Sequence, residues 1–385
     1  MKVAFSTGRP AHVTLPANLL AQRGIDVTIY TAAYRSRFQQ LAPCVRLKWV
    51  PQLVPSFHFL TGVQLPRLFQ RVDTAIYDCL VSLRMEPFDI FWGWASGALA
   101  SGRAARRRGA KFVLDRACPH VDVQQALVRT ECERLGVRYQ PEPRWFRERQ
   151  LAEYDEADII LVPSQYSRRS FPTTLQAKVL VAPLFGRIPT AQPAAAFASE
   201  SPDRPFTFGT VGGQPLRKGF LYLLQAWEKM QLPNAQLLLR TDAPLHRFPA
   251  LRDLLHRLPN VEIAGYVHDM SSFYRRCDAF VFPTVDDGFG MALLEAMAHG
   301  LPSIATEHCG GAELFTPEKD LLVAPAQNAD ALAEAMGRLY ISAELRESLA
   351  RNALEALRGI QGDAAYSLYA KALDGVIQTT RSPIP

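Results

Sequence analysis

The chain has 385 residues, a length typical of two domains, and 48% of them are apolar, which is enough to build a core in each. This composition excludes a disordered or collagen-like chain. Charged residues make up 21%, and the longest apolar runs fall well short of the roughly 18 to 20 residues that span a bilayer. The first residues, 1–6, lack the apolar core and cleavage site of a signal peptide, so we expect a cytoplasmic protein.

Charge is distributed unevenly along the chain. Residues 1–200 contain 26 Lys and Arg against 16 Asp and Glu, a net charge of +10, and the remainder has a net charge of −4. A basic half is compatible with nucleic acid, an anionic membrane surface or a phosphorylated substrate, and the alternative is a solvated helix face. The densest basic cluster consists of Arg103, Arg106, Arg107, Arg108 and Lys111. No aromatic residues alternate with it and no zinc spacing accompanies it, so we expect no nucleic-acid partner.

Short β-branched or aromatic runs alternate with longer segments of helical period, a pattern typical of helices packed around a parallel sheet. In the first half, the expected strands are residues 27–30, 89–92, 111–114 and 159–162. In the second half, they are residues 206–211, 235–239, 261–263, 279–282 and 303–305. The sequence therefore predicts two doubly wound α/β domains, residues 1–186 and 206–360, joined by a Pro-, Ala- and Ser-rich linker at 187–205.

Two segments do not belong to this alternation. Residues 361–385 contain an amphipathic helix at 363–378, which must pack on another surface, and the first domain is a candidate. Residues 47–71 mix Trp, Phe, Leu and Pro with few charges. An interfacial membrane loop, an apolar lid over a cleft and a buried connection all fit this stretch.

The most informative segment is residues 282–302, where a strand ends, a Gly-rich turn follows and a helix begins near Gly290. Backbone amides of Phe289, Gly290 and Met291 are expected to point past the helix start, where the helix dipole favours an anion. The sequence therefore predicts a phosphate-binding turn.

Two carboxylates accompany this turn. Asp287 lies in it, and Glu295 follows eight residues later, about 2.2 helical turns on, so both can border one groove. The structural alternative is that Asp287 only caps the helix and Glu295 only satisfies neighbouring backbone groups.

This spacing resembles the Glu-x7-Glu signature of the retaining, nucleotide-sugar-dependent glycosyltransferases of family 4, which have the GT-B fold. Three other segments resemble motifs of the same family in the same order: residues 212–227 its phosphate-binding loop, 259–267 its base-binding loop and 309–313 its Gly-Gly-x-Glu segment. The resemblance covers residues 205–358 almost continuously. It implies two Rossmann-like domains that face a cleft, with the donor in the second domain.

The resemblance also implies individual roles. Glu295 would bind the donor ribose, Lys218 would neutralise the diphosphate, and Asp287 with the turn 288–290 would meet the transferred sugar and its phosphate. The residues implied in catalysis are His120, Lys218 and Asp287. Those implied in donor binding are Gly8, Gly213, Arg217, Lys218, Tyr266, Val267, Asp287, Gly288, Phe289, Gly290, Met291 and Glu295.

Two positions depart from the family pattern. Asp287 stands where the family commonly has Glu, and Gly213 stands where it has Arg, so Arg217 is the nearest cation that could replace that Arg. A Lys and Arg pair can stabilise a leaving diphosphate without a metal ion, so we expect no metal site and no cofactor. The departures keep open a catalytically silent nucleotide-sugar-binding protein or partner subunit. A phosphorylase or epimerase on the same fold is a further alternative.

The first half resembles the family more weakly. Gly8 follows the first strand, where a glycine lets the backbone approach donor and acceptor. His120 follows the strand at 111–114, where similar enzymes place a His that faces the sugar. Arg9, His12 and Arg116 are acceptor-side candidates, and for Arg116 a salt bridge to Asp115 or Asp122 is the structural alternative.

The resemblance implies transfer of a sugar from a UDP- or GDP-linked donor to an acceptor held by the first domain, with retention of anomeric configuration. A glycan, a lipid-linked glycan and a small molecule remain open as acceptors. The charge of the first half adds the expectation of peripheral contact with an anionic membrane at its inner face.

Overall fold

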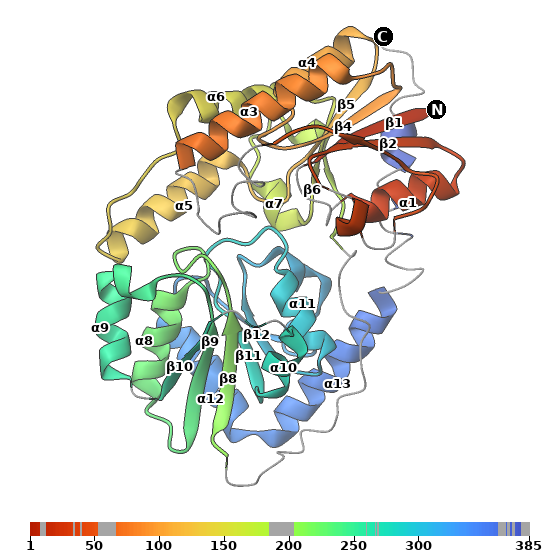
Figure 1. Ribbon diagram of the computed structural model, residues 1–385. Coiled ribbons are helices and arrows are strands. Elements are labelled where there is room, and N and C mark those ends of the chain that lie inside the picture. Colours follow the sequence, from red (N-terminus) through yellow and green to blue (C-terminus); the bar gives the residue numbers. More distant parts are fainter. Residues whose placement is uncertain are drawn as a thin grey trace.

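The computed structural model describes residues 1–7, 13–33, 35–38, 41–52, 67–184, 204–258, 260–265, 267, 269–360, 367, 370–371 and 374–378. Two α/β domains lie one above the other (Figure 1). Four of the predicted site residues, Gly8, Arg9, His12 and Tyr266, lie outside the described residues, as does most of the predicted linker.

The first domain is built on a seven-stranded parallel sheet with the strand order β3-β2-β1-β4-β5-β6-β7. Its strands are β1 (Lys2–Ser6), β2 (Asp26–Thr31), β3 (Arg46–Trp49), β4 (Ile90–Trp94), β5 (Lys111–Asp115), β6 (Ile159–Val162) and β7 (Val179–Val181). Its helices are α1 (Thr14–Gln22), α3 (Arg67–Arg84), α4 (Leu99–Arg107), α5 (Val121–Arg134), α6 (Arg144–Glu156) and α7 (Gln165–Arg169). The strand order reverses between β1 and β4, which opens a crevice at the carboxyl ends of these strands.

The second domain is built on a six-stranded parallel sheet with the order β10-β9-β8-β11-β12-β13. Its strands are β8 (Phe206–Val211), β9 (Ala235–Arg240), β10 (Val261–Ala264), β11 (Ala279–Phe282), β12 (Ser303–Thr306) and β13 (Leu322–Ala324). Its α-helices are α8 (Phe220–Met230), α9 (Pro249–Arg257), α10 (Met270–Arg275), α11 (Met291–Ala298), α12 (Ala329–Ile341) and α13 (Ala343–Ile360). Short 3-10 helices occupy Arg35–Arg37, Gln176–Lys178, Leu245–Arg247 and Gly310–Leu314 in the two domains.

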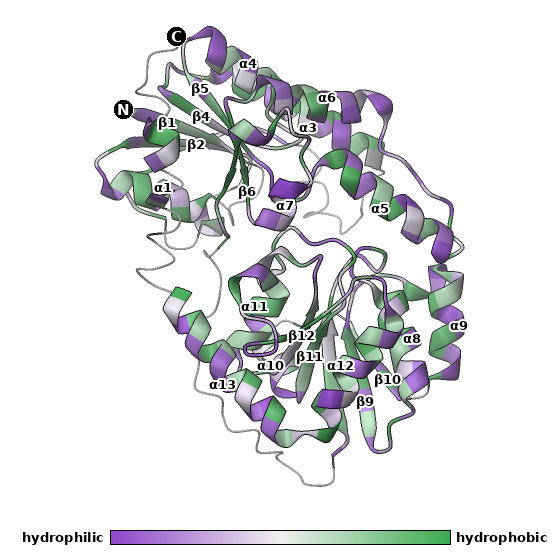
Figure 2. Ribbon diagram, turned by 180° about the vertical axis from the view of Figure 1, so that it is seen from behind, coloured by the Kyte–Doolittle hydropathy of each residue, from purple (hydrophilic) through white to green (hydrophobic). Residues whose placement is uncertain are grey.

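The strands form because their residues are apolar on both faces, as a parallel sheet covered by helices on two sides requires. β6 and β11 are buried along their whole length. Figure 2 shows the strands as largely hydrophobic and the outer helices as a mixture of hydrophobic and hydrophilic residues. Each sheet therefore separates two hydrophobic clusters, one against each of its faces.

The predicted fold class is confirmed, and every predicted strand is present with ends shifted by at most two residues. Three short strands, β3, β7 and β13, were not predicted. The stretch 47–71 is not one apolar segment, because residues 46–49 form β3 and α3 begins at Arg67. Residues 53–66 between them lie outside the described part, so the lid and membrane-loop interpretations stay predictions.

The end of the chain returns to the first domain. Residues 374–378 are helical, and Val376 is buried in the same hydrophobic cluster as Val3 and Phe5 of β1. Asp374 forms an ion pair with Arg23 at 3.4 Å. The prediction that the final helix packs on the first domain is confirmed for these residues.

Within the described part of the chain, no helix combines the length and the apolarity needed to cross a membrane.

Candidate active site at the domain boundary

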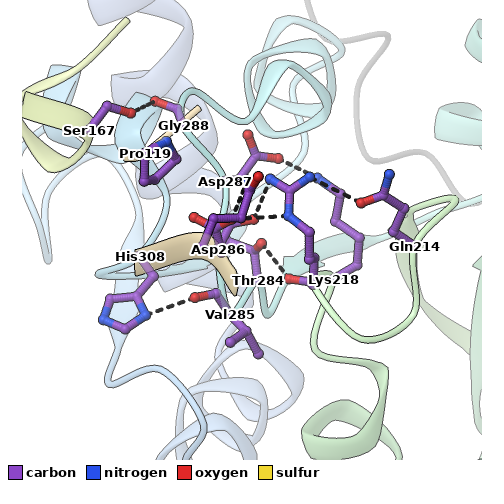
Figure 3. A network of polar contacts seen from close by, with 12 residues as sticks. Pro119, Ser167, Gln214, Lys218, Thr284, Val285, Asp286, Asp287, Gly288 and His308 are labelled. Carbon is purple, nitrogen blue, oxygen red and sulfur yellow. Dashed lines mark hydrogen bonds and ion pairs between the residues drawn. The ribbon is translucent and has the colours of Figure 1, made fainter. Parts of the chain in front are cut away.

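The turn between β11 and α11 lies at the carboxyl end of the second sheet and contacts the first domain (Figure 3). Gly290 precedes α11 with a φ of 82°, in the left-handed region that glycine adopts without strain. The Asp287 Oδ1 atom accepts hydrogen bonds from the amides of Phe289 at 3.1 Å and Gly290 at 2.8 Å. We expected these amides to be open to an anion, but the chain's own carboxylate occupies them.

Asp287 also forms an ion pair with Lys218. The Lys218 ammonium lies 4.8 Å from the centroid of the Phe282 ring, a cation–π distance. Burial opposes ionisation of Asp287, but the charges of Lys218 and Arg217 hold the pKa of that carboxyl below its usual range. The structure therefore brings together two of the three predicted catalytic residues as a charged pair.

The loop that carries Lys218 fits closely against the strand end. Gly219, at the start of α8, has a φ of 64°, and a Cβ there would lie 1.8 Å from the Pro283 carbonyl oxygen. Only glycine can therefore occupy this position without moving the loop away from β11. Gly213 is under no such steric constraint, because it is exposed and a Cβ there would meet no atom within 4 Å.

Arg217 is hydrogen-bonded to other residues of the chain. Its Nε donates to Asp286 Oδ2 at 3.0 Å, its NH2 group donates to the Asp286 carbonyl at 3.1 Å, and its NH1 group donates to Gln214 at 3.0 Å. The Arg217 guanidinium, which we predicted to bind the donor, is thus hydrogen-bonded to residues of this chain. Sequence reasoning missed the partner, although the Asp286-Asp287 pair was visible beside the Gly-rich turn.

The remaining predicted donor residues lie around the same turn. Glu295 accepts a hydrogen bond from the Tyr274 hydroxyl at 3.1 Å, so its carboxylate has a side-chain donor in addition to any backbone contact. Burial, with the neighbouring Glu295 charge, raises the pKa of Tyr274. Phe289 is buried in the core beside α11, and Val267 and Met291 pack partly buried against that core.

The first domain contacts the turn directly. The Ser164 hydroxyl, which caps α7 by accepting from the Ser167 amide, donates to the Gly288 carbonyl at 2.7 Å. A Cβ at Gly288 would lie 2.3 Å from the Ala117 carbonyl oxygen. The turn at residues 288–290 and the loop after β5 are therefore in contact across the domain boundary.

His120 lies just beyond this loop and precedes α5. Its Nδ1 accepts from the Asp122 amide at 3.3 Å, and its ring packs 5.0 Å from Tyr154 and 5.2 Å from Phe171. Burial lowers the pKa of His120, with Asp122 opposing the shift. The described contacts are those of a helix-capping and packing residue, and the sugar contact stays a prediction.

Arg116 is buried and its guanidinium donates to the Pro119 carbonyl, at 3.1 and 2.9 Å, and to Gln150 and Gln124 at 3.3 and 3.4 Å. The alternative of a salt bridge to Asp115 or Asp122 is wrong. Asp122 pairs with Arg147 instead. Arg116 therefore shapes the loop before α5.

Sequence reasoning also missed Asp115, which ends β5. Burial raises the pKa of its carboxyl to about 7, although Trp92 Nε1 donates to it at 3.4 Å and opposes the shift. It lines a small hollow at the crevice between β1 and β4. The hollow is lined by Phe5, Ser6, Thr7, Val13, Pro16, Trp92, Trp94 and Asp115. Its position at a strand's carboxyl end was the available signal.

The basic cluster on α4 is partly neutralised. Arg103 and Arg106 pair with Glu156 at 2.9 and 3.0 Å, and Lys111 lies 3.9 Å from Asp158. Arg108 donates to the Met85 carbonyl at 2.9 Å. These contacts favour the solvated-face interpretation for most of the cluster, with Arg107 exposed beside them.

No group of three or more His, Cys, Asp and Glu side chains suited to a metal ion occurs among the described residues.

Comparison with known proteins identifies the second domain. Residues 205–342 match the family model described as glycosyl transferases group 1. The capsular polysaccharide biosynthesis glycosyltransferase CapM of Staphylococcus aureus is 30% identical over 153 residues, which are 38% of this chain and 40% of CapM. The D-inositol 3-phosphate glycosyltransferase of Actinosynnema mirum is 27% identical over 402 aligned positions, 92% of this chain and 89% of that one.

Among solved structures, HepE of Anabaena in complex with UDP and glucose aligns with a TM-score of 0.68 and 16% identity, over 98% of this chain and 100% of HepE. This likeness shows the GT-B fold. Against CapM and several other curated glycosyltransferases, the chain aligns with less than half of the relative's length. Residues 205–342 thus match a glycosyltransferase family model, and the chain as a whole has the GT-B fold.

Proposed function

We propose that the protein is a metal-independent, retaining glycosyltransferase that moves a sugar from a UDP- or GDP-linked donor to an acceptor held by the first domain. The observation that carries the proposal is the charged pair of Lys218 and Asp287, at a helix-start turn within the matched family region. The Lys218 ammonium can neutralise part of the charge on the diphosphate of such a donor.

The ion pair explains how Asp287 and Lys218 can act in turn. A bound diphosphate carries more negative charge than one carboxylate, so it competes with Asp287 for the Lys218 ammonium. Once the Lys218 ammonium contacts the diphosphate, the Asp287 carboxylate stays at the same turn and lies beside the sugar of the donor. Lys218 then opposes the charge that develops on the diphosphate as the donor bond breaks.

The proposed reaction breaks the bond between the anomeric carbon and the diphosphate oxygen, and forms a bond from the same carbon to an acceptor hydroxyl oxygen on the same face. The acceptor proton passes to the departing phosphate oxygen. No side-chain nucleophile is required, so retention follows from front-face substitution. Contact of the two domains around the turn would limit access of water and so limit donor hydrolysis.

The donor assignment is tested with a panel of nucleotide diphosphate sugars, by release of nucleoside diphosphate from the wild type and from two variants. Lys218→Ala should lower kcat by roughly 100-fold, a magnitude typical of losing one charge-stabilising group. The matched control is Lys229→Ala, which removes an exposed pair with Asp330 and should leave kcat unchanged.

Turnover lost in EDTA and restored by Mg²⁺ would contradict metal independence, and an inverted anomeric signal in the product NMR spectrum would contradict retention. Nucleotide binding without any turnover would favour the silent binder.

We further propose that the first domain contacts an anionic membrane from the cytoplasmic side. The support is an exposed apolar face on α3, formed by Phe69, Val72, Ile76 and Leu83, whose spacing of three, four and seven residues keeps them on one side of the helix. α3 packs against α4, which ends at the exposed Arg107. An apolar helix face beside cations is the composition of a surface that lies on lipid.

A further inference from the structure

The Asp286 carboxylate is buried at the domain boundary with 1% of the residue exposed. Its Oδ2 accepts from Arg217 Nε and from Gln124 Nε2, each at 3.0 Å, and its Oδ1 accepts from the Tyr166 hydroxyl at 3.2 Å. Arg217 belongs to the loop before α8, whereas Gln124 and Tyr166 belong to α5 and α7 of the first domain. One buried carboxylate therefore joins the donor loop to two helices of the opposite domain.

Asp286 and Arg217 also hold each other through the backbone. The Arg217 carbonyl accepts from the Val285 amide at 2.8 Å and from the Thr284 hydroxyl at 2.9 Å. Lys218 follows Arg217 in the chain, and Asp287 follows Asp286. These two following residues form the ion pair described above. A displacement of Asp286 must therefore be transmitted to both members of that pair.

Burial makes the contact sensitive to domain separation. A buried carboxylate is costly unless hydrogen bonds and an opposite charge compensate it, and Arg217 supplies the charge. If the domains move apart, Asp286 loses two of its three side-chain donors, and hydrogen bonds to a charged group are stronger than those between neutral groups. Domain contact and the position of the Arg217 loop are thus linked through one side chain.

We propose that Asp286 is a positioning residue that senses contact of the first domain through Gln124 and Tyr166 and holds the Lys218 and Asp287 pair in the geometry for transfer. This inference rests on the proposed function. The contacts continue into the first domain, because Gln124 Oε1 accepts from Arg116 at 3.4 Å. Asp286 acts through its neighbours and is not itself a catalytic residue.

The test compares two residues of α7 that both reach the second domain. Tyr166→Phe removes the hydroxyl that donates to Asp286, and Arg169→Ala removes an exposed ion pair with Glu313 at 2.6 Å. Tyr166→Phe should lower kcat by roughly tenfold while the donor KM changes by less than about threefold, the pattern of an interaction realised in the transition state. Arg169→Ala should change neither. In an Asp286→Ala background, which lacks both acceptor oxygens, Tyr166→Phe should have no further effect, because the two share one contact.

A second measurement does not depend on turnover. Hydrogen exchange at the amides of Phe289 and Gly290, which donate to Asp287, should be faster in Tyr166→Phe and Asp286→Asn than in the wild type, and unchanged in Arg169→Ala. Unchanged exchange in Tyr166→Phe, an equal effect of Arg169→Ala, or a raised KM with unchanged kcat would overturn the positioning role. A wild type that turns over no donor would contradict the proposed function, and exchange alone would then decide whether Asp286 positions the turn.

Discussion

Gly288 of the second domain approaches the loop after β5 of the first so closely that a Cβ at this position would lie 2.3 Å from the Ala117 carbonyl oxygen. Its own carbonyl accepts from the Ser164 hydroxyl at 2.7 Å. The two domains therefore meet at the predicted phosphate-binding turn itself. A methyl group added at Gly288 should push them apart there.

Gly288→Ala should lower transfer by roughly tenfold or more, because the methyl group forces either the turn or the first domain to shift, and small displacements of reacting groups cost large factors in rate. The measurement is initial rate with the best donor, with nucleoside diphosphate affinity measured by calorimetry. Gly359→Ala, on α13 and outside every predicted site, is the matched control, since a Cβ there meets no atom within 4 Å and the rate should not fall. Equal rates for Gly288→Ala and the wild type would show that this contact does not matter for transfer.

The second prediction concerns Glu295, whose carboxylate accepts from the Tyr274 hydroxyl at 3.1 Å. If it binds the donor ribose, Glu295→Ala should weaken nucleoside diphosphate binding by at least about tenfold, the effect of losing hydrogen bonds to a charged acceptor. Calorimetry with UDP and GDP measures it, and thermal unfolding checks that the fold is retained. Tyr274→Phe is the control, because it removes the internal partner and leaves the carboxylate. Wild-type affinity in Glu295→Ala for every nucleotide that the parent binds would show that the ribose assignment is wrong.

The sequence predicts the central strands well because continuous apolar runs leave few alternatives. β6, β8 and β11 have the predicted ends. β3 was not predicted because half of its Arg-Leu-Lys-Trp sequence is charged, which an edge strand tolerates, and β7 and β13 are only three residues long. Local periodicity carries too little signal for such strands.

The site is predictable only in part, for a related reason. Family resemblance assigned Lys218 and Asp287 to one donor site without predicting a contact between them, and the contact of Gln124 with Asp286 spans 162 residues of sequence. No spacing or composition rule connects two positions on different domains. The same holds for the pairing of Arg217 with Asp286, because this partner is set by the packing of the loop on the strand end. Donor binding by Arg217 stays a prediction.

The third prediction addresses the proposed membrane contact. Replacing Phe69 and Ile76 by Ser, at the exposed face of α3, should abolish most cosedimentation with vesicles that contain anionic lipid, since each buried apolar side chain contributes about 1.5 to 3 kcal/mol. Arg107→Ala should weaken binding further at low salt only, because attraction to the surface is screened over about 10 Å at 0.1 M. Arg252→Ala, an exposed residue of α9 in the second domain, is the control. Absence of lipid association by the wild type at low salt would contradict the proposal and favour a soluble acceptor.

The last prediction follows from Asp115, a carboxyl whose burial raises its pKa from 3.8 to about 7. Between these two values the folded protein holds a proton that the unfolded chain releases, so stability is full at low pH and falls as the pH rises toward 7. Each pKa unit corresponds to about 1.4 kcal/mol, so the loss at pH 8 amounts to as much as about 4 kcal/mol.

Asp115→Asn cannot ionise and still offers Trp92 Nε1 an oxygen acceptor, so it should escape this loss. We expect the variant to unfold at a higher temperature than the wild type at pH 8, and by a much smaller margin at pH 4.5. Thermal denaturation followed by circular dichroism at the two pH values measures the difference. Glu153, whose pKa burial also raises to about 7, is present in both proteins and cancels in the comparison. The exposed Asp330→Asn should show no pH-dependent difference, and an equal stability difference for Asp115→Asn at both pH values would mean that the carboxyl is ionised throughout.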